Sequence, residues 1–350
     1  LVNILYSLGT LIYPYLLSKE IIRNRWWRLL PIFLVTNTLM YAFISGGVSY
    51  DNLTNLTAAA GIYYLVKVLK GRKIITNSLL GMVFIAVGTL TKKTMPPLAV
   101  VIFLIWLIYI IKNRRLLNLK AEFNWKTPIL AALTIFLLGL NVSLWGVNLV
   151  KYQQPIPSCT KLFTQAQCDQ SVFVLQSKAL NLPSEKPPLG QVINDPEKTP
   201  INYIHNYWVE RELSTIYGIL GHKVYYPTFL ITLFRAFYFL LLLLTIRYWV
   251  KRDTVFNALL AITVSYILII FVQGYTGELA SNFHHLAIQG RYMFPIIVPF
   301  YILVTTFISG ISNQVIRKVT LISSLVLTFI SGPVLFLLFF SNPFYPKWFF

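Results

Sequence analysis

The chain has 350 residues, of which 56% are hydrophobic and 12% charged, and its formal net charge is +19. Soluble domains carry about 25% charged residues, so this composition excludes an ordinary soluble domain. The excess of positive charge does not indicate nucleic-acid binding, because lysine and arginine gather in the cytoplasmic loops of membrane proteins and set their topology. We expect a lipid bilayer as the surroundings and no nucleic acid as a partner.

Apolar runs recur along the whole chain, and each can cross a hydrocarbon layer of about 30 Å. They predict an all-α polytopic membrane protein with about ten transmembrane helices and one large extracytoplasmic loop. Residues 1–149 form an N-terminal bundle, 150–226 the loop and 227–350 a C-terminal bundle. The candidate spans are residues 2–18, 29–46, 53–69, 74–91, 96–111, 127–149, 227–247, 254–273, 292–310 and 319–340.

The loops between these runs alternate in charge, and one set is basic. The positive-inside rule places that set in the cytoplasm, which puts both ends of the sequence on the outer side of the plasma membrane. The basic set holds 18 of the 30 lysines and arginines, namely Lys19, Arg23, Arg25, Arg28, Lys67, Lys70, Arg72, Lys73, Lys112, Arg114, Arg115, Lys120, Lys126, Arg247, Lys251, Arg252, Arg317 and Lys318.

The long outer segment contains both cysteines of the chain, Cys159 and Cys168. An oxidising compartment and this spacing favour a disulfide, and two free thiols are the alternative. Further along, residues 201–217 carry apolar side chains at helical spacing, which predicts an amphipathic helix lying on the outer membrane surface.

Ionisable groups at membrane edges are costly to bury, so they usually face a cavity, a partner or water. In this chain the polar groups that lie within the apolar runs or at loop tips map to the outer side. Their shared side predicts a site that faces the periplasm or the exterior. The group comprises Asp51, Lys92, Lys93, Glu210, Arg211, Glu212, Glu278, Arg291 and the four histidines His205, His222, His284 and His285.

Asp51 lies in the segment "SYDNLTN", just before the third predicted span. One interpretation is a helix N-cap, because aspartate accepts hydrogen bonds from the first free N–H groups of a helix. Asp51 also lies within one turn of Asn52 and Asn55. Together these oxygen donors could orient a hydroxyl group or ligate a hard divalent cation, Mg²⁺ or Mn²⁺. The sequence leaves that cation open as a cofactor.

Two further segments place cations on the outer side. Lys92 and Lys93, in "GTLTKKTMPP", either snorkel to the interface or pair with an anion such as phosphate. His284, Ile288 and Arg291 follow i, i+4, i+7 spacing, which predicts one helical face. The arginine suits forked recognition of a phosphate, and an interfacial anchor is the alternative. The histidines match no zinc motif, so no metal ligand is assigned.

Four segments carry a resemblance to a known family. They are "GGVSYDNLTNLTAAAGIYYLVKVLKGRK", "GMVFIAVGTLTKKTMPPL", "STIYGILGHKVYYP" and "AIQGRYMFPIIVPFYIL". The chain resembles the GT-C superfamily of glycosyltransferases that use polyprenyl-phosphate sugars, of the protein-O-mannosyltransferase and aminoarabinose-transferase type. More narrowly, it is similar to an uncharacterised bacterial family of membrane proteins placed near that superfamily. The resemblance covers nearly the whole chain, and residues 50–52 and 289–292 carry most of it.

This resemblance implies that an acceptor attacks the anomeric carbon of the sugar at the outer face while the polyprenyl phosphate leaves. The acceptor would be a cell-envelope glycan, glycolipid or protein. Asp51 and Glu278 are the candidate catalytic carboxylates. The residues expected to bind substrate, including the cations that stabilise the phosphate, are Asn52, Lys92, Lys93, Glu210, Arg211, His284, His285, Gln289, Arg291 and Tyr292.

The sequence departs from the GT-C pattern in one respect. In that type the principal catalytic aspartate lies in the first outer loop, whereas this chain starts outside and descends at once. We therefore expect a first span and its loop to precede Leu1, which makes Asp51 a second acidic residue that supports substrate or metal. Two other functions stay open: a flippase or transporter of lipid-linked oligosaccharides, and an O-antigen-type polymerase or ligase.

Overall fold

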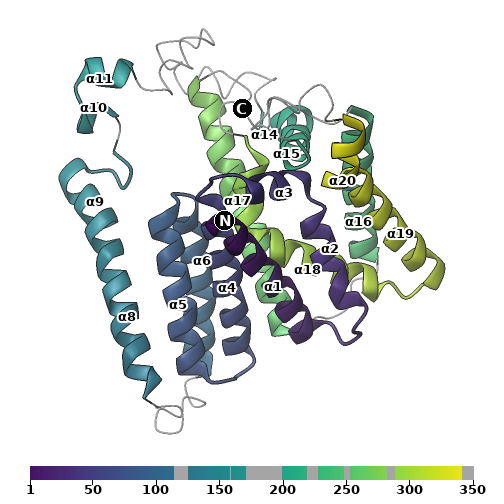
Figure 1. Cartoon of the computed structure of the whole chain (residues 1–350), viewed down its shortest axis with the longest axis horizontal. Coiled ribbons are helices and arrows are strands. Elements are labelled where there is room, and N and C mark those ends of the chain that lie inside the picture. Colours follow the sequence, from purple (N-terminus) through teal and green to yellow (C-terminus); the bar gives the residue numbers. More distant parts are fainter. Residues whose placement is uncertain are drawn as a thin grey trace.

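The computed structural model describes residues 1–113, 125–157, 159–170, 199–218, 228–247, 253–281 and 288–340. Within these ranges every regular element is a helix, which confirms the predicted helical class. The long helices run between two opposite ends of the molecule (Figure 1). His222, His284 and His285 lie outside the described residues.

In the described part of the chain, seven helical segments are long and apolar enough to cross a membrane, or eight if a bent pair counts as one span. This confirms a multi-pass helical membrane protein and does not confirm a count of ten. The segments are α5 (Ile74–Thr91), α6 (Met95–Lys112), α8 to α9 (Lys126–Tyr152), α16 (Thr228–Arg247), α17 (Thr254–Ser281), η6 with α18 (Gly290–Ile296 and Ile297–Gly310), and α19 to η7 (Gln314–Phe340).

Helices α1 (Val2–Ile21) and α4 (Asp51–Leu69) are long enough to span but do not belong to this apolar set. The reason is that both carry polar side chains, which they bury against each other. Ser7 of α1 donates a hydrogen bond of 2.9 Å to the amide oxygen of Asn52 in α4. Most of α4 is buried, and it contacts α1, α5, α6, α18 and η6, so it is the central helix of the bundle.

The candidate span over residues 29–46 is present as two helices that meet at an angle of 64° and reach the length and hydropathy of a span only together. The first arm comprises η1 (Trp27–Leu29) and α2 (Leu30–Thr36), and the second is α3 (Leu39–Gly46). Two polar side chains mark the break: Asn37 donates to the Phe33 carbonyl at 2.9 Å, and Thr38 to the Leu34 carbonyl at 2.8 Å. Side chains of this kind compete with the backbone for its acceptors and bend helices.

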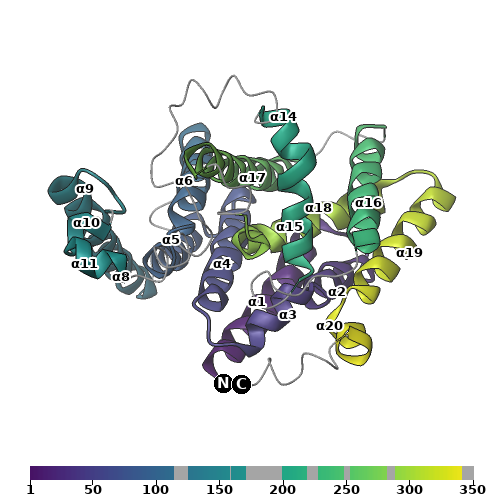
Figure 2. The ribbon, with the colours of Figure 1, turned by 90° about the horizontal axis from the view of Figure 1, so that it is seen from above.

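The predicted helix over residues 201–217 is present as one continuous helical run. It consists of α14 (Pro200–Tyr203), the π-helical segment η5 (Ile204–Trp208) and α15 (Val209–Ile216). Thr199 caps its start by accepting a hydrogen bond from the Asn202 amide. The run lies crosswise over one end of the bundle, as the views from the side and from above both show (Figures 1 and 2), and α15 contacts α3, α16 and η6.

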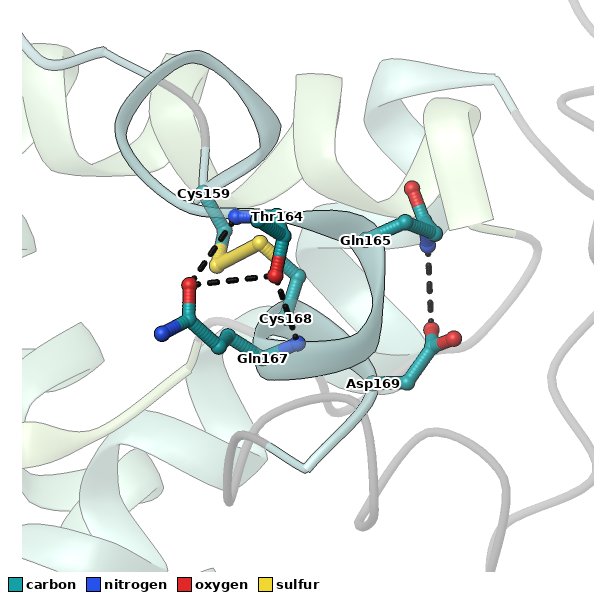
Figure 3. The surroundings of a disulfide bond; sticks show 6 residues. All are labelled: Cys159, Thr164, Gln165, Gln167, Cys168 and Asp169. Atoms are coloured by element: carbon teal, nitrogen blue, oxygen red, sulfur yellow. Dashed lines mark hydrogen bonds between the residues drawn. A yellow bond between two sulfur atoms is a disulfide. The ribbon is translucent and has the colours of Figure 1, made fainter.

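Two short helices at the same end of the molecule, α10 (Cys159–Leu162) and α11 (Gln165–Asp169), are joined by the Cys159–Cys168 disulfide (Figure 3). The Cα atoms of the two cysteines are 5.7 Å apart. Thr164 and Gln167 form a reciprocal capping box at the start of α11. The disulfide is therefore the arrangement found, and not the two free thiols.

Candidate functional site

The first residue of α4, Asp51, lies at the centre of a charged cluster. Its carboxylate is only 1% exposed and forms an ion pair with Lys92. The second carboxylate oxygen accepts a hydrogen bond from the Ser49 hydroxyl at 3.1 Å and lies 3.8 Å from Nη1 of Arg291. Tyr50, which precedes the helix, makes no side-chain capping bond. The N-cap interpretation of Asp51 is therefore wrong: Asp51 is the first helical residue, and its carboxylate balances two cations.

Lys92 follows the C-terminal end of α5 and is 7% exposed, so it does not snorkel into water. Its ammonium lies 5.0 Å from the ring centre of Tyr292 and 5.7 Å from that of Tyr50, distances at which a cation is attracted to an aromatic face. Burial lowers the pKa of Lys92, and the neighbouring carboxylate of Asp51 opposes that shift. Lys93, by contrast, is exposed.

Arg291 lies in the 3₁₀ segment η6. Its Nε donates a hydrogen bond of 2.8 Å to the side-chain oxygen of Gln289, and its guanidinium is 5.9 Å from the ring centre of Tyr292. About a third of the arginine side chain, 34%, is exposed. We call Asp51, Lys92, Gln289, Arg291 and Tyr292 the cation cluster. It contains two cations and one carboxylate, so it suits an added anion.

One predicted feature of this segment is wrong. The spacing of His284, Ile288 and Arg291 predicted a single helical face, but Ile288 and Gln289 are not helical. Gln289 is extended, with φ of −143° and ψ of 117°, and the 3₁₀ turn begins only after it. The orientation of the Arg291 side chain is therefore set by η6 and by its hydrogen bond to Gln289. His284 and His285 belong to the residues that are not described.

Two neighbouring helices hold η6 in place. The Gly290 amide donates to the Thr215 hydroxyl of α15 at 2.7 Å, and a Cβ at position 290 would lie 2.5 Å from the backbone nitrogen of Ile216. Only glycine fits this approach. On the other side, the Tyr266 hydroxyl of α17 lies within hydrogen-bonding distance of the Tyr292 carbonyl, at 3.0 Å. These contacts position the exposed end of Arg291.

Asn52, a predicted substrate contact, is buried in the bundle. Its amide nitrogen donates to the Ile44 carbonyl at 2.8 Å, and its oxygen accepts from Ser7. The side chain joins α1, α3 and α4, and this placement favours a structural role. Asn55 is also buried, and its amide nitrogen has no hydrogen-bond partner among the described residues.

The other predicted residues belong to a second group around α15. Glu210 is exposed and Arg211 half-buried, while Glu278 of α17 is 3% exposed. Glu212 belongs to the outer-side ionisable group of the sequence but was not predicted to contact substrate. It is 5% exposed, and its carboxylate has no hydrogen-bond partner in the described part of the chain. Burial raises the pKa of Glu212 to about 8.

Tyr203 lies near enough to both buried carboxylates of this second group for their charges to act on it. Burial raises its pKa, and Glu278 and then Glu212 raise it further through their charges. Glu278 therefore belongs to the surroundings of α14 and α15. The sequence did contain a signal for Glu212, because helical spacing places it on one face with the apolar residues Val209, Leu213 and Ile216.

Among the described residues, no group of three or more histidine, cysteine, aspartate or glutamate side chains is arranged to hold a metal ion. A divalent cation stays a prediction. No family model, curated protein or solved structure matches the chain. The role of the cation cluster is therefore argued from its own geometry.

Proposed function

We propose that the protein is a membrane glycosyltransferase that moves a sugar from a polyprenyl-phosphate donor to a cell-envelope acceptor. The observation that supports this most is the cation cluster, in which Arg291 is one-third exposed and shares the single carboxylate of Asp51 with Lys92. A polyprenyl phosphate would place its anionic group at the end of the apolar helices, where Arg291 lies.

The proposed reaction is a displacement at the anomeric carbon. The acceptor oxygen forms a bond to that carbon while the bond from the carbon to the phosphate oxygen breaks, which inverts the configuration. The acceptor proton passes to a carboxylate base, for which Glu278 stays the candidate. Negative charge grows on the departing phosphate, and a fixed guanidinium stabilises such charge better than water does because it needs no reorganisation.

Asp51 has a positioning role in this proposal. Both of its oxygens are engaged, by Lys92 on one side and by Ser49 and Arg291 on the other, and the side chain is almost fully buried. An acceptor hydroxyl could reach the carboxylate only by displacing one of these partners. We therefore assign Asp51 to holding the two cations in place rather than to taking the acceptor proton.

The test is transfer of radiolabelled sugar from a panel of polyprenyl-phosphate sugars in membranes that contain the chain. Arg291→Ala should abolish transfer while the amount of protein in the membrane stays normal. Removal of a preorganised charge that stabilises a transition state costs about 10²–10³ in rate. Arg291→Lys should recover only part of the activity. Lysine keeps the positive charge but cannot form the two parallel hydrogen bonds of a guanidinium.

Arg317→Ala is the matched control, since Arg317 lies at the start of α19 and donates to the Ile311 carbonyl, away from the cation cluster. Its transfer rate should equal that of the unmodified chain. Full transfer by Arg291→Ala would refute the assignment of Arg291. An absence of transfer from every donor by the unmodified chain would refute the proposed function itself.

The bend of 64° between α2 and α3 supports a second candidate, a flippase for lipid-linked oligosaccharides. Transporters build their substrate sites from broken helices whose backbone groups line a cavity. A fluorescent lipid-linked oligosaccharide would be followed across the bilayer of reconstituted vesicles. Translocation without any sugar transfer would favour this function over the first.

A further inference from the structure

A cavity of about 920 Å³ lies between α15, α16 and α18. Ligand sites in proteins have volumes of about 300–1,000 Å³ and are mostly apolar with a few polar groups that orient the ligand. This cavity fits that description, because aromatic and aliphatic side chains form most of its wall. The apolar part includes Trp208, Leu213, Ile216, Phe239, Leu242 and Phe300.

The carboxyl group in the wall of the cavity is buried, and burial favours its neutral form. Glu212 lines the wall without a hydrogen-bond partner in the described structure, and its raised pKa keeps the carboxyl protonated at neutral pH. A protonated carboxyl can both donate and accept a hydrogen bond. A buried polar group without a partner is costly, so a ligand that supplied one would be favoured.

Three tyrosines add hydroxyl groups to the same wall. The hydroxyls of Tyr217 and Tyr238 are 3.2 Å apart, and that of Tyr301 lies 2.7 Å from the hydroxyl of Thr38. Tyrosine is neutral at pH 7, since its ordinary pKa is about 10. The wall of the cavity thus contains tyrosine and carboxyl side chains, which suit a neutral, hydrogen-bonding head better than an anionic one.

The bilayer side of the cavity is formed by α16, where Phe239 and Leu242 both line the cavity and are 60% and 56% exposed. Exposed apolar residues on a membrane-crossing helix face lipid, so a hydrocarbon chain could enter between them. Arg235, the one arginine of the lining, already donates a hydrogen bond of 2.8 Å to the His205 carbonyl. That bond partly satisfies its guanidinium.

Segment η6 lies between this cavity and the cation cluster. Met293, Phe294 and Ile296 line the cavity, whereas Arg291 and Tyr292 belong to the cluster. An anionic group would find two cations at the cluster. The cavity instead offers one arginine, already bonded to the His205 carbonyl, and otherwise neutral side chains in apolar surroundings.

We propose that this cavity binds an uncharged lipid with a hydroxyl head, which enters from the bilayer and hydrogen-bonds to Glu212. The inference goes beyond the proposed function, because it concerns a different cavity and holds whether or not the chain transfers sugars. Hydrocarbon burial supplies the affinity, and the neutral carboxyl and tyrosine hydroxyls select a neutral head over a charged one.

The test uses the full chain in phosphatidylcholine nanodiscs and a long-chain alcohol that carries a photoactivatable diazirine. After illumination, mass spectrometry should locate the label on α15 and α16. The unlabelled alcohol should compete for the site, and its phosphate monoester should not. Glu212→Gln, which resembles the protonated carboxyl, should keep labelling. Glu212→Leu should reduce labelling about tenfold, which corresponds to a loss of about 1.4 kcal/mol in binding free energy. Glu210→Gln, at an exposed neighbour, is the control.

A second variant makes the test independent of the folding of Glu212→Leu. Ala236 lines the cavity and is exposed on α16, so Ala236→Trp should fill the entrance and abolish labelling. Unchanged labelling in both Glu212→Leu and Ala236→Trp would overturn the proposal. So would stronger competition by the phosphate monoester than by the alcohol, which would identify an anionic lipid at Arg235.

Discussion

Asp51 and Lys92 form an ion pair with side chains that are 1% and 5% exposed, so each is the counter-charge that the other needs. Removing one partner of such a pair leaves an uncompensated buried charge and costs about 3–5 kcal/mol. Asp51→Asn should lower the melting temperature of the purified protein markedly. The double variant Asp51→Asn with Lys92→Met should recover much of that loss, because no buried charge remains.

The ion pair between Glu20 and Arg72 is the matched control for this prediction, because the arginine side chain is 56% exposed. Water screens such a pair, and its loss costs at most about 1 kcal/mol. Arg72→Gln should therefore change the melting temperature little. Equal changes of melting temperature in Asp51→Asn and Arg72→Gln would show that water screens the charges of the cation cluster.

Glu212 makes stability depend on pH in a predictable direction. Burial raises the pKa of its carboxyl from 4.5, the value expected in the unfolded chain, to about 8 in the folded protein. The unfolded state releases the proton first, so the contribution of Glu212 to stability is present below pH 4.5 and is lost as the pH rises towards 8. The loss at pH 8 is on the order of a few kcal/mol.

Glu212→Gln cannot ionise, so its melting temperature relative to the unmodified protein should increase between pH 4.5 and pH 8. A series of thermal unfolding curves across this range measures the difference, which should reach several degrees. Glu210→Gln, at an exposed carboxylate, should show no such trend. A constant difference for Glu212→Gln at all pH values would contradict the raised pKa.

At the scale of elements, η6 depends on one glycine. A Cβ at position 290 would meet the backbone of Ile216 at 2.5 Å, and no side-chain rotation could relieve that contact. Gly290→Ala should therefore separate η6 from α15, at a cost of about 1–3 kcal/mol for overpacking. In sugar-transfer assays it should lower activity further, because Arg291 moves with η6.

Gly139→Ala is the control for this variant, since Gly139 lies within α8 and a Cβ there has nothing within 4 Å. Its free energy of unfolding should be unchanged or increase by up to about 1 kcal/mol, because alanine favours helices. The melting temperature should therefore stay the same or rise. A Gly290→Ala protein as stable and active as Gly139→Ala would show that η6 and α15 adjust freely.

The sequence predicted the cations of the site better than their surroundings. Loop position alone placed Lys92 and Arg291 on one side with Asp51, and the structure joins the three. The local backbone was predicted less well, because the apolar run after Arg291 has helical composition throughout. The features that distinguish a 3₁₀ turn there are Pro295 within the run and Gly290 just before Arg291, and the effect of Gly290 depends on the packing of α15.

At the scale of the whole molecule, apolar runs predicted the membrane class and most helix positions, since burial in lipid requires such runs whatever the packing. The break at residues 37 and 38 was missed because polar side chains there satisfy backbone groups locally. The burial of Glu212 was not predicted, for a different reason. Its burial depends on α15 lying against α16 and η6, contacts between segments far apart in the sequence.

The arrangement of loops also predicts how the chain lies in the membrane. The turn between α4 and α5 and the starts of α8 and α17 lie at one end of the molecule, opposite α10, α11 and the α14–α15 run (Figure 1). Lysine and arginine are frequent at the first end, and the disulfide lies at the second. The positive-inside rule therefore predicts a cytoplasmic first end and an outer second end.

Single cysteines test this orientation in a chain whose disulfide has been removed by Cys159→Ser and Cys168→Ser. Lys161→Cys, in α10, should react with a membrane-impermeant maleimide on intact cells. Lys112→Cys, at the end of α6, should react only after the membrane is permeabilised, although both side chains are exposed. Labelling of Lys112→Cys on intact cells, with Lys161→Cys protected, would reverse the orientation and place the cation cluster on the cytoplasmic side. A donor already carried across the membrane could not reach the cluster there, so the proposed transfer reaction depends on this result.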